Sequence, residues 1–399
     1  LSRFEEPLDL NLVFSGHGKH LDCPTLQLAN HHGLMIAGEA ALSNWDAGMD
    51  MYIYGKLGNL IMTKEGINVL MTNLTGKVPP ILQRLDYIRF NGEAAGYLHD
   101  LTLTGLFYTG AGMVKTDVMM SIDEQSMSRT YSGSVASADL DLGKLLNQEK
   151  KFGKVDFNVE LKGFNYKNRY PESYIKGIIS SFEYSQYQYE NIMLDGVYKD
   201  GGFNGRLSMD DANGSVQIDG NFNVAKTIPD FNLKASVKNL RPHDLHLSDK
   251  YENASISLDL TADFTGKSID DMNGRISLDS LQLNAPDERG CFLDNLTITA
   301  GQVSGEKELR INSSFMTAVI RGDYSYHTIP ASVVKTVQRY IPSLLTIKDN
   351  MPEPHNNFQF DICLENTEVL SKLFQIPLEL YLPASLKGYF NDGEEKLHV

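Results

Sequence analysis

The chain has 399 residues and a formal net charge of −15. This acidic balance argues against nucleic acid as a partner, because affinity for phosphates comes from Lys and Arg. The three cysteines, Cys23, Cys291 and Cys363, are too far apart for a metal-binding or disulfide pattern. No apolar run reaches the roughly 18 residues that a membrane-spanning helix needs. Because the sequence begins at Leu1 and not at Met, we expect a piece of a longer protein, with any membrane anchor outside it.

Residues 1–90 are predicted to be a β-rich segment that begins the sheet. Their most metal-like feature is the spacing of His17, His20 and Cys23, which are side chains of the kind that bind zinc. In strands and turns, however, residues three apart do not share a face as they do on a helix. The alternative is a set of exposed histidines in a glycine-rich turn, and no metal site is predicted. Residues 79–85 are predicted to form a short helical turn.

Residues 91–328 are predicted to form a repeated module of β-strands, because apolar and polar residues alternate there with a period of two. Such alternation indicates strands with one apolar and one polar face, as in antiparallel sheets. Three similar strand-and-turn stretches begin at Asp100, Asn191 and Asp294, with spacings of about 90 to 105 residues. They favour one elongated stack of hairpins, and the alternative is two or three separate β-sandwiches.

The module contains many dipeptides in which glycine follows Asn or Asp. These dipeptides are predicted to be mostly hairpin turns, with some strand bulges among them. They are Asn91-Gly92, Asp195-Gly196, Asp200-Gly201, Asn204-Gly205, Asn213-Gly214, Asp219-Gly220 and Asn273-Gly274.

Helices are expected to be rare. Residues 329–346 are predicted to be an amphipathic helix, because apolar residues recur there at helical spacing after Pro330. Three roles are open for this helix, which are to plug the groove, to gate it or only to pack against the sheet. The candidates for a groove plug are Val333, Val337, Tyr340, Ile341 and Leu344. Residues 347–399 are predicted to be a β segment with a short helix near 367–374, capped by Asn366 or Thr367.

No residue pattern in the chain points to catalysis or to a cofactor, and we expect a protein that is not an enzyme and has no cofactor. Asp210-Asp211-Ala212-Asn213-Gly214 is only superficially similar to a calcium loop and is better explained as an acidic hairpin tip. Tyr184, Tyr187 and Tyr189 could stack on sugars, as in glycan-binding or glycan-active β-solenoids, or could simply belong to a half-buried strand.

Several of the turn-and-strand patterns resemble the TamB and AsmA-like envelope proteins of Gram-negative bacteria (the translocation and assembly module), in the form found in Bacteroides-type bacteria. The resemblance covers about residues 90–400. Its residues are Tyr198–Gly205, Asp211–Ser215, Val237–Pro242, Ala262–Gly266, Met272–Gly274, Ile376–Leu378 and Leu386–Gly388.

The resemblance implies a mainly β fold, with an elongated antiparallel β-sheet folded into a groove with an apolar lining (a β-taco). It implies a periplasmic protein anchored in the inner membrane, with roles in phospholipid transport and outer-membrane biogenesis. It also implies a barrel partner of the Omp85 type. The anchoring helix and the barrel-contacting segment expected of this family are not identifiable in the sequence.

We therefore expect a groove protein of the cell envelope that shields the acyl chains of phospholipid during lipid transport. One alternative is a scaffold for outer-membrane protein assembly or secretion, and a second is the glycan-binding or glycan-active solenoid. The apolar face has two interpretations, an open groove or an ordinary filled core. The lipid-lining candidates are Val155, Phe157, Val159, Leu161, Phe231, Leu233, Val237, Ile256, Leu258, Leu260, Phe358, Phe360 and Ile362.

Overall fold

The computed structural model describes residues 8–75, 78–123, 125–126, 128–165, 172–249, 252–286, 290–329, 356–374, 383–391 and 396–398. The chain divides into two compact units. Unit 1 comprises residues 1–200 and 205–211, and unit 2 comprises residues 201–204 and 212–399. Strand β12 (Gly202–Asp211) is shared between them.

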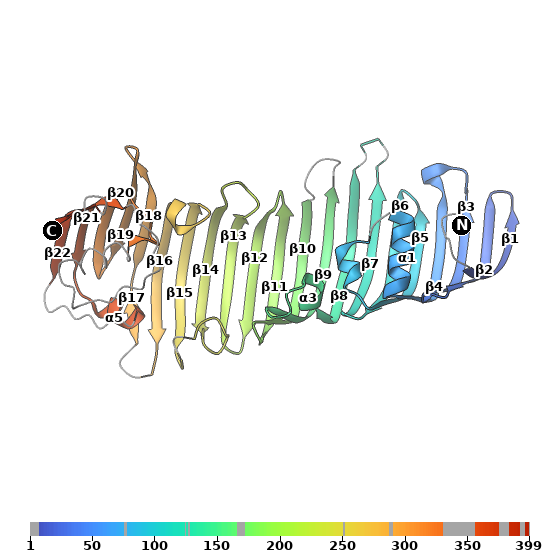
Figure 1. Cartoon of the computed structure of the whole chain (residues 1–399), viewed down its shortest axis with the longest axis horizontal. Helices are drawn as coiled ribbons and strands as arrows, with labels where there is room; N and C mark the ends of the chain where they lie inside the picture. Colours follow the sequence, from blue (N-terminus) through green and yellow to red (C-terminus); the bar gives the residue numbers. More distant parts are fainter. Residues whose placement is uncertain are drawn as a thin grey trace. The chain divides into compact units, whose positions relative to one another are not determined.

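Unit 1 is an open antiparallel sheet in which each strand pairs with its neighbours along the sequence (Figure 1). Turns make most of these connections, and the longer, helix-containing segments 64–86 and 142–151 make two of them, so the pairing follows chain order. The strands are β1 (Leu8–His17), β2 (His20–Asn30), β3 (Leu34–Ser43), β4 (Tyr52–Thr63), β5 (Tyr87–Tyr97), β6 (Asp100–Thr109), β7 (Gly112–Ile122), β8 (Arg129–Asp141), β9 (Phe152–Asn165), β10 (Glu172–Tyr184) and β11 (Tyr187–Lys199).

In unit 2, too, the strands pair in antiparallel fashion with their neighbours along the sequence. The one departure is that β16 pairs with both β17 and β18. Its strands are β13 (Gly214–Asn223), β14 (Asp230–Leu240), β15 (Ser255–Thr265), β16 (Asn273–Asn284), β17 (Cys291–Leu293), β18 (Leu296–Val303), β19 (Glu306–Ser313), β20 (Met316–Asp323), β21 (Asn357–Leu364), β22 (Ala384–Asn391) and β23 (Lys396–His398).

Helices are few among the described residues, and none of them is long and apolar enough to cross a lipid bilayer. They are α1 (Lys64–Thr75), α2 (Pro80–Gln83), α3 (Leu142–Leu146) and α5 (Glu368–Phe374), with single 3₁₀ turns η1 (Gly48–Asp50) and η2 (Ile269–Asp271). The expected turn at 79–85 and the expected helix near 367–374 are present as α2 and α5. The amphipathic helix predicted for 329–346 lies, apart from its first residue, outside the described residues.

The predicted fold class is confirmed: the chain is mainly β, with an open antiparallel sheet in each unit, and the helices in the described ranges are short. Neither unit is a sandwich of two sheets in its described part, because consecutive strands pair with one another in a single series. Helix α1 was not predicted. Its residues Ile67 and Met71 are four apart on one helix face, and both pack in a buried cluster with Leu85 and Ile88.

Most of the predicted glycine turns are not turns. Five of the dipeptides lie inside strands: Asn91-Gly92 in β5, Asp195-Gly196 in β11, Asn204-Gly205 in β12, Asp219-Gly220 in β13 and Asn273-Gly274 in β16. In four of them, at Gly92, Gly205, Gly220 and Gly274, a Cβ atom on the glycine would meet the carbonyl oxygen of the neighbouring strand at 2.2 to 2.3 Å. Close approach of two backbones, not chain reversal, is therefore the reason for these glycines.

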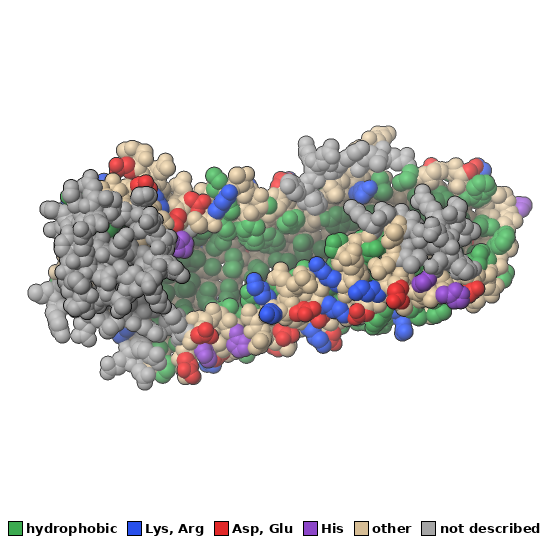
Figure 2. Space-filling model, viewed as in Figure 1, with side chains coloured by type: hydrophobic (Ala, Val, Ile, Leu, Met, Phe, Trp, Pro, Cys, Tyr) green, Lys and Arg blue, Asp and Glu red, His purple; other side chains and the backbone are tan. Residues whose placement is uncertain are grey.

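Gly133 in β8 and Gly220 in β13 show the geometry most clearly. Their φ angles are 144° and 148°, which side chains rarely adopt. A Cβ on Gly133 would lie 2.0 Å from the Asp117 carbonyl oxygen, and one on Gly220 would lie 2.2 Å from that of Asn232. Glycine kinks of this kind give curvature to a sheet. Figure 2 shows, in each unit, an apolar face hollowed between rims of polar side chains.

We predict that Gly133→Ala destabilises the protein by about 2 to 4 kcal/mol, because it adds both a backbone clash and an unfavourable φ. The measurement is urea unfolding followed by circular dichroism. Gly55→Ala is the matched control, since a Cβ on Gly55 meets no atom within 4 Å. It should change the unfolding free energy by less than about 1 kcal/mol. Equal losses in the two variants would contradict the close-packing explanation.

A second prediction concerns pH and the hairpin between β15 and β16. The Ser268 hydroxyl donates to Asp271 at 2.6 Å and the Lys267 N–H donates to it at 3.0 Å. These bonds lower the pKa of Asp271 to about 2. A carboxyl whose pKa is lower in the folded state stabilises that state above its unfolded pKa, near about 4, and loses this effect as pH falls through about 2.

Asp271→Asn should therefore melt below the unchanged protein at pH 7, and the two melting temperatures should converge as the pH is lowered toward 2. Thermal melts at several pH values measure this. A gap in melting temperature that stays constant with pH would show that the charge of Asp271 is not the cause.

Candidate functional site

The strand register places all the lipid-lining candidates of unit 1 on one face of its sheet. In β9, Phe157, Val159 and Leu161 pair on one side with Ser137, Val135 and Gly133 of β8. On the other side the same residues pair with Ile179, Gly177 and Ile175 of β10. Directly paired residues point to the same side of an antiparallel sheet. The apolar positions therefore form continuous rows across the strands, and we call this side the lining face of unit 1.

Unit 2 has a corresponding lining face. Phe231, Leu233 and Val237 of β14 pair with Phe264, Ala262 and Leu258 of β15. Ile256, Leu258 and Leu260 of β15 pair in turn with Leu283, Leu281 and Leu278 of β16. The rings of Phe231 and Phe264 stack with their centroids 4.7 Å apart. These candidates, which were scattered in the sequence, are thus neighbours in the structure.

Charge is segregated to the opposite side, which we call the polar face. It carries residues such as Asp156 and Glu160 in unit 1 and Lys234 and Asp259 in unit 2. Pairs such as Lys176–Asp195, at 3.5 Å, and Lys387–Asp361, at 2.8 Å, join its strands. Among the described residues of β8–β11 and β13–β16, the lining faces carry one charged side chain, Arg129, at the first position of β8, where it pairs with Asn165.

Helices cover only parts of the lining faces within the described residues. In unit 1, α1 packs near β4 and α3 packs near β9. In unit 2, α5 packs near β17, where Val369 is buried with Leu293 and Phe315. Elsewhere the lining side chains are mostly half-buried, as for Val159, Leu233 and Leu258. Half-buried apolar side chains on a face with very few charged side chains are the geometry of a groove that can accept an apolar ligand.

The candidates of β21 stand in a different environment. Phe358 and Phe360 lie on the lining face of unit 2, but each is only 7% exposed. Both belong to a buried cluster with Tyr324 and Phe390, against which Ile362 also packs. This end of unit 2 is therefore a filled core. Val155, at 3% exposure, is similarly enclosed in unit 1.

A polar network beside this core was not predicted from the sequence. The Lys307 ammonium lies 4.5 Å from the ring centroids of both Tyr324 and Tyr326, and 3.6 Å from an Asp270 carboxylate oxygen. Asp270 in turn accepts hydrogen bonds from the Ser325 hydroxyl and the Tyr326 N–H. Burial raises the pKa of both tyrosines. No local sequence signal marks this network, because its members are up to 56 residues apart.

The other sequence candidates do not assemble into a chemical site. His20 bonds to Ser43 and Asp22, and no group of three His, Cys, Asp or Glu residues in the described parts of the chain could hold a metal ion. Asp211 accepts from the Tyr187 hydroxyl at 2.5 Å.

Tyr184, Tyr187 and Tyr189 pack in an aromatic cluster with Phe152 and Phe182. Ring packing within unit 1 therefore explains why tyrosines occupy these three positions. The groove-plug candidates Val333, Val337, Tyr340, Ile341 and Leu344 lie outside the described residues.

No family model, curated protein or solved structure matches this chain.

We predict that the filled and half-buried parts of the lining face of unit 2 respond differently to truncation. Phe360→Ala should lower the unfolding free energy by about 3 to 5 kcal/mol, because it leaves a cavity in a packed core. Phe231→Ala, a change of the same size on the same face, should cost about 1 to 2 kcal/mol, because its ring is already partly solvated. Urea titration measures both losses, and similar values would contradict the distinction between core and groove.

Proposed function

We propose that this protein is a non-enzymatic groove that shields the acyl chains of phospholipid and takes part in phospholipid transport between the inner and outer membranes. In this proposal it acts in the periplasm, as part of a longer protein anchored in the inner membrane. The observation that carries the proposal is the half-buried apolar lining face, with very few charged side chains, that runs from strand to strand in each unit. The resemblance to TamB and AsmA-like proteins, noted in the sequence, points in the same direction.

The energetics of lipid transfer explain why such a face is useful. Burial of each CH₂ group contributes about 0.8 kcal/mol, so a 16-carbon chain loses on the order of 12 kcal/mol when it enters water. An apolar face with very few charged side chains removes most of this penalty along its length. A single buried carboxylate would create a new barrier on this face, because an unpaired charge in an apolar environment costs several kcal/mol.

A second candidate function, a scaffold for outer-membrane protein assembly with a barrel partner of the Omp85 type, is favoured by one observation. Strand β1 pairs only with β2 among the described residues, and its Leu10, Val13 and Phe14 are 47%, 54% and 66% exposed. An apolar strand whose second edge is not paired by any described residue can accept another strand by β-augmentation. This function predicts binding of unfolded barrel peptides and little lipid.

The first experiment is extraction of the purified protein with organic solvent, followed by mass spectrometry of the extract. Phospholipid in a fixed ratio to protein supports the groove function. A folded protein free of lipid would overturn it and would favour the scaffold, which is then tested by binding of peptides from an outer-membrane barrel.

We further predict that Leu258→Asp reduces the bound phospholipid at least fivefold. Leu258 is half-buried on the lining face of unit 2, between Val237 and Leu281. The new carboxylate would lie among apolar side chains and repel an acyl chain. Thr261→Asp is the matched control, since it adds the same charge to the same strand on the polar face, opposite Lys234. Circular dichroism establishes that both variants are folded. Unchanged lipid in folded Leu258→Asp would show that the lining assignment is wrong.

A further inference from the structure

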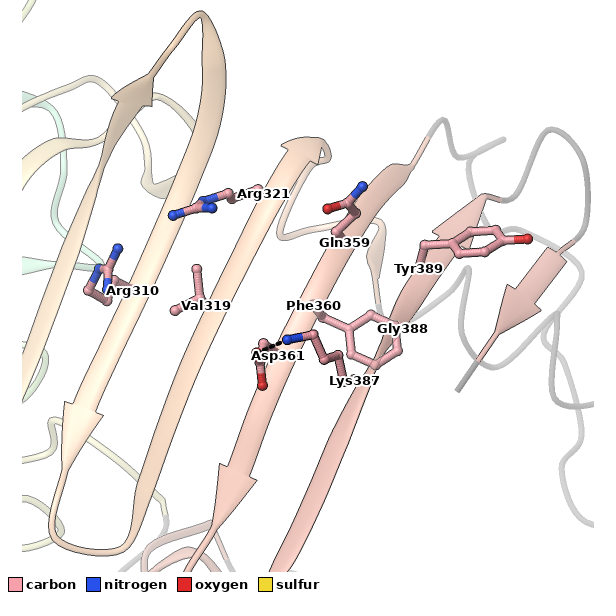
Figure 3. A pocket seen from close by; sticks show the side chains of 9 residues that line it. All are labelled: Arg310, Val319, Arg321, Gln359, Phe360, Asp361, Lys387, Gly388 and Tyr389. Atoms are coloured by element: carbon pink, nitrogen blue, oxygen red, sulfur yellow. Dashed lines mark hydrogen bonds and ion pairs between the residues drawn. The ribbon is translucent and has the colours of Figure 1, made fainter.

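The polar face of unit 2 contains a hollow that the groove function does not use. Its volume is about 530 Å³, within the usual range of small-molecule sites. Neighbouring strands β19, β20, β21 and β22 form its floor, and Figure 3 shows the side chains that surround it. Its lining residues are Arg310, Val319, Arg321, Gln359, Phe360, Asp361, Lys387, Gly388 and Tyr389.

Register arranges the polar side chains of the hollow in two rows. Arg321 of β20 pairs with Gln359 of β21, which pairs with Tyr389 of β22. In the next row, Val319 pairs with Asp361, which pairs with Lys387. The Lys387 ammonium and the Asp361 carboxylate are 2.8 Å apart. The floor is thus apolar at Val319 and is bordered by donors and acceptors of hydrogen bonds.

Two guanidinium groups stand on one side of this hollow, and a buried carboxylate holds them in place. Glu308, which is 7% exposed, accepts from Arg310 at 3.0 Å and also from Arg321. The hydrogen bond from Arg321 keeps the pKa of Glu308 below its usual value, so the carboxylate is ionised at neutral pH. Each arginine presents five N–H donors, and these contacts occupy only one edge of each guanidinium.

The charges near the hollow favour an anion. Among the residues that line the hollow and the carboxylate that binds its arginines, Arg310, Arg321 and Lys387 outnumber Glu308 and Asp361 by one positive charge, although the whole chain carries −15. Arginine pairs with carboxylates in a planar, bidentate geometry, and fixing a guanidinium in advance reduces the entropy lost on binding. A carboxylate held by Arg321 or Arg310 would therefore be bound in a defined orientation.

The far side of the hollow suits a hydroxylated ring. Gln359 can both donate and accept hydrogen bonds, Asp361 can accept them, and Tyr389 offers the apolar face of a ring with a polar tip. Tyr389 is 41% exposed, so its ring is accessible from solvent. A lipid in the groove cannot supply this ligand through its headgroup, because the hollow lies on the face of the sheet opposite the lining.

From this arrangement we infer that the hollow between β19 and β22 is a binding site for an acidic sugar, a pyranose that carries a carboxylate. The carboxylate pairs with the guanidinium groups of Arg310 and Arg321, and the ring lies over Val319 toward Gln359 and Tyr389. The site binds and does not catalyse. It is independent of lipid in the groove, so either assignment can fail without the other.

The test is a ligand-detected NMR titration of the whole chain with glucuronate, with glucose as the neutral analogue and inorganic phosphate as the bare anion. A ligand of this size should bind with a dissociation constant of about 1 mM. Binding should weaken as salt is added, because part of it is electrostatic. Glucose and phosphate should each bind at least fivefold more weakly than glucuronate.

Arg321→Gln should weaken glucuronate binding about tenfold, the usual effect of losing a charge-assisted hydrogen bond. This change also removes a hydrogen bond to the buried Glu308 carboxylate, so a second variant is needed. Arg310→Lys keeps the positive charge and loses only the planar guanidinium group. It should weaken binding at least threefold in a protein that melts normally. Arg275→Gln is the control, since Arg275 is exposed on the polar face of unit 2 on β16, outside the hollow.

Three results would overturn the assignment. Equal affinity for glucose would show that the carboxylate is not recognised, and equal affinity for phosphate would show that the ring is not recognised. Unchanged glucuronate binding in both folded arginine variants, or the same loss in Arg275→Gln, would place any binding outside this hollow.

Discussion

Register between neighbouring strands governs this protein, because side chains in a strand alternate between two faces. A slip of one residue in any pairing would move every side chain of that strand to the opposite face. In β14, for example, it would bring Lys234 among the apolar rows and expose Leu233 among the charges. The apolar pattern of each strand therefore selects its own register, since only one alignment keeps nearly all charged side chains off the lining faces. Cross-strand contacts such as the stacked rings of Phe231 and Phe264 add to this selection.

The curvature of the sheet is a second constraint on the residues of the lining face. Where two backbones approach closely, a Cβ atom has no room, and the lining face has glycine at several such points. Gly133 and Gly220 occupy them in units 1 and 2 and adopt φ angles that other residues avoid. The lining face thus combines large apolar side chains with positions that have no side chain. This combination produces a hollowed surface instead of a flat sheet, and a hollowed apolar surface is what the proposed lipid groove requires.

The two faces of the sheet are suited to different ligands for one electrostatic reason. Charged side chains are stable on the polar face, where water and neighbouring strands compensate them, and they are rare on the lining face. An apolar chain can therefore lie on one side, while an anion can be recognised on the other. Buried Glu308 illustrates how the polar face can recognise an anion, since it holds two arginines in a fixed position that exposed ion pairs lack. The core at Phe358, Phe360 and Phe390 shows that the apolar face can also be filled.

The sequence by itself determined the fold class, the alternation of faces and the identity of the apolar residues that share a face. These features are local, since a period of two along a strand is visible without any knowledge of its neighbours. The helix α5 was also predictable from its spacing and cap. The continuation of apolar positions in phase across Gly220, from Ile218 to Phe222, is a signal that could have distinguished a strand kink from a turn.

Tertiary structure alone decided which parts of the lining face are filled and which are half-buried. Phe360 and Leu258 stand in similar alternating strands, but only Phe360 is enclosed, by side chains from other strands. The hollow between β19 and β22 was equally invisible in the sequence, because its residues come from segments up to about 80 positions apart. Burial and convergence of side chains depend on which strands become neighbours and what covers them. A local pattern carries no information on either point.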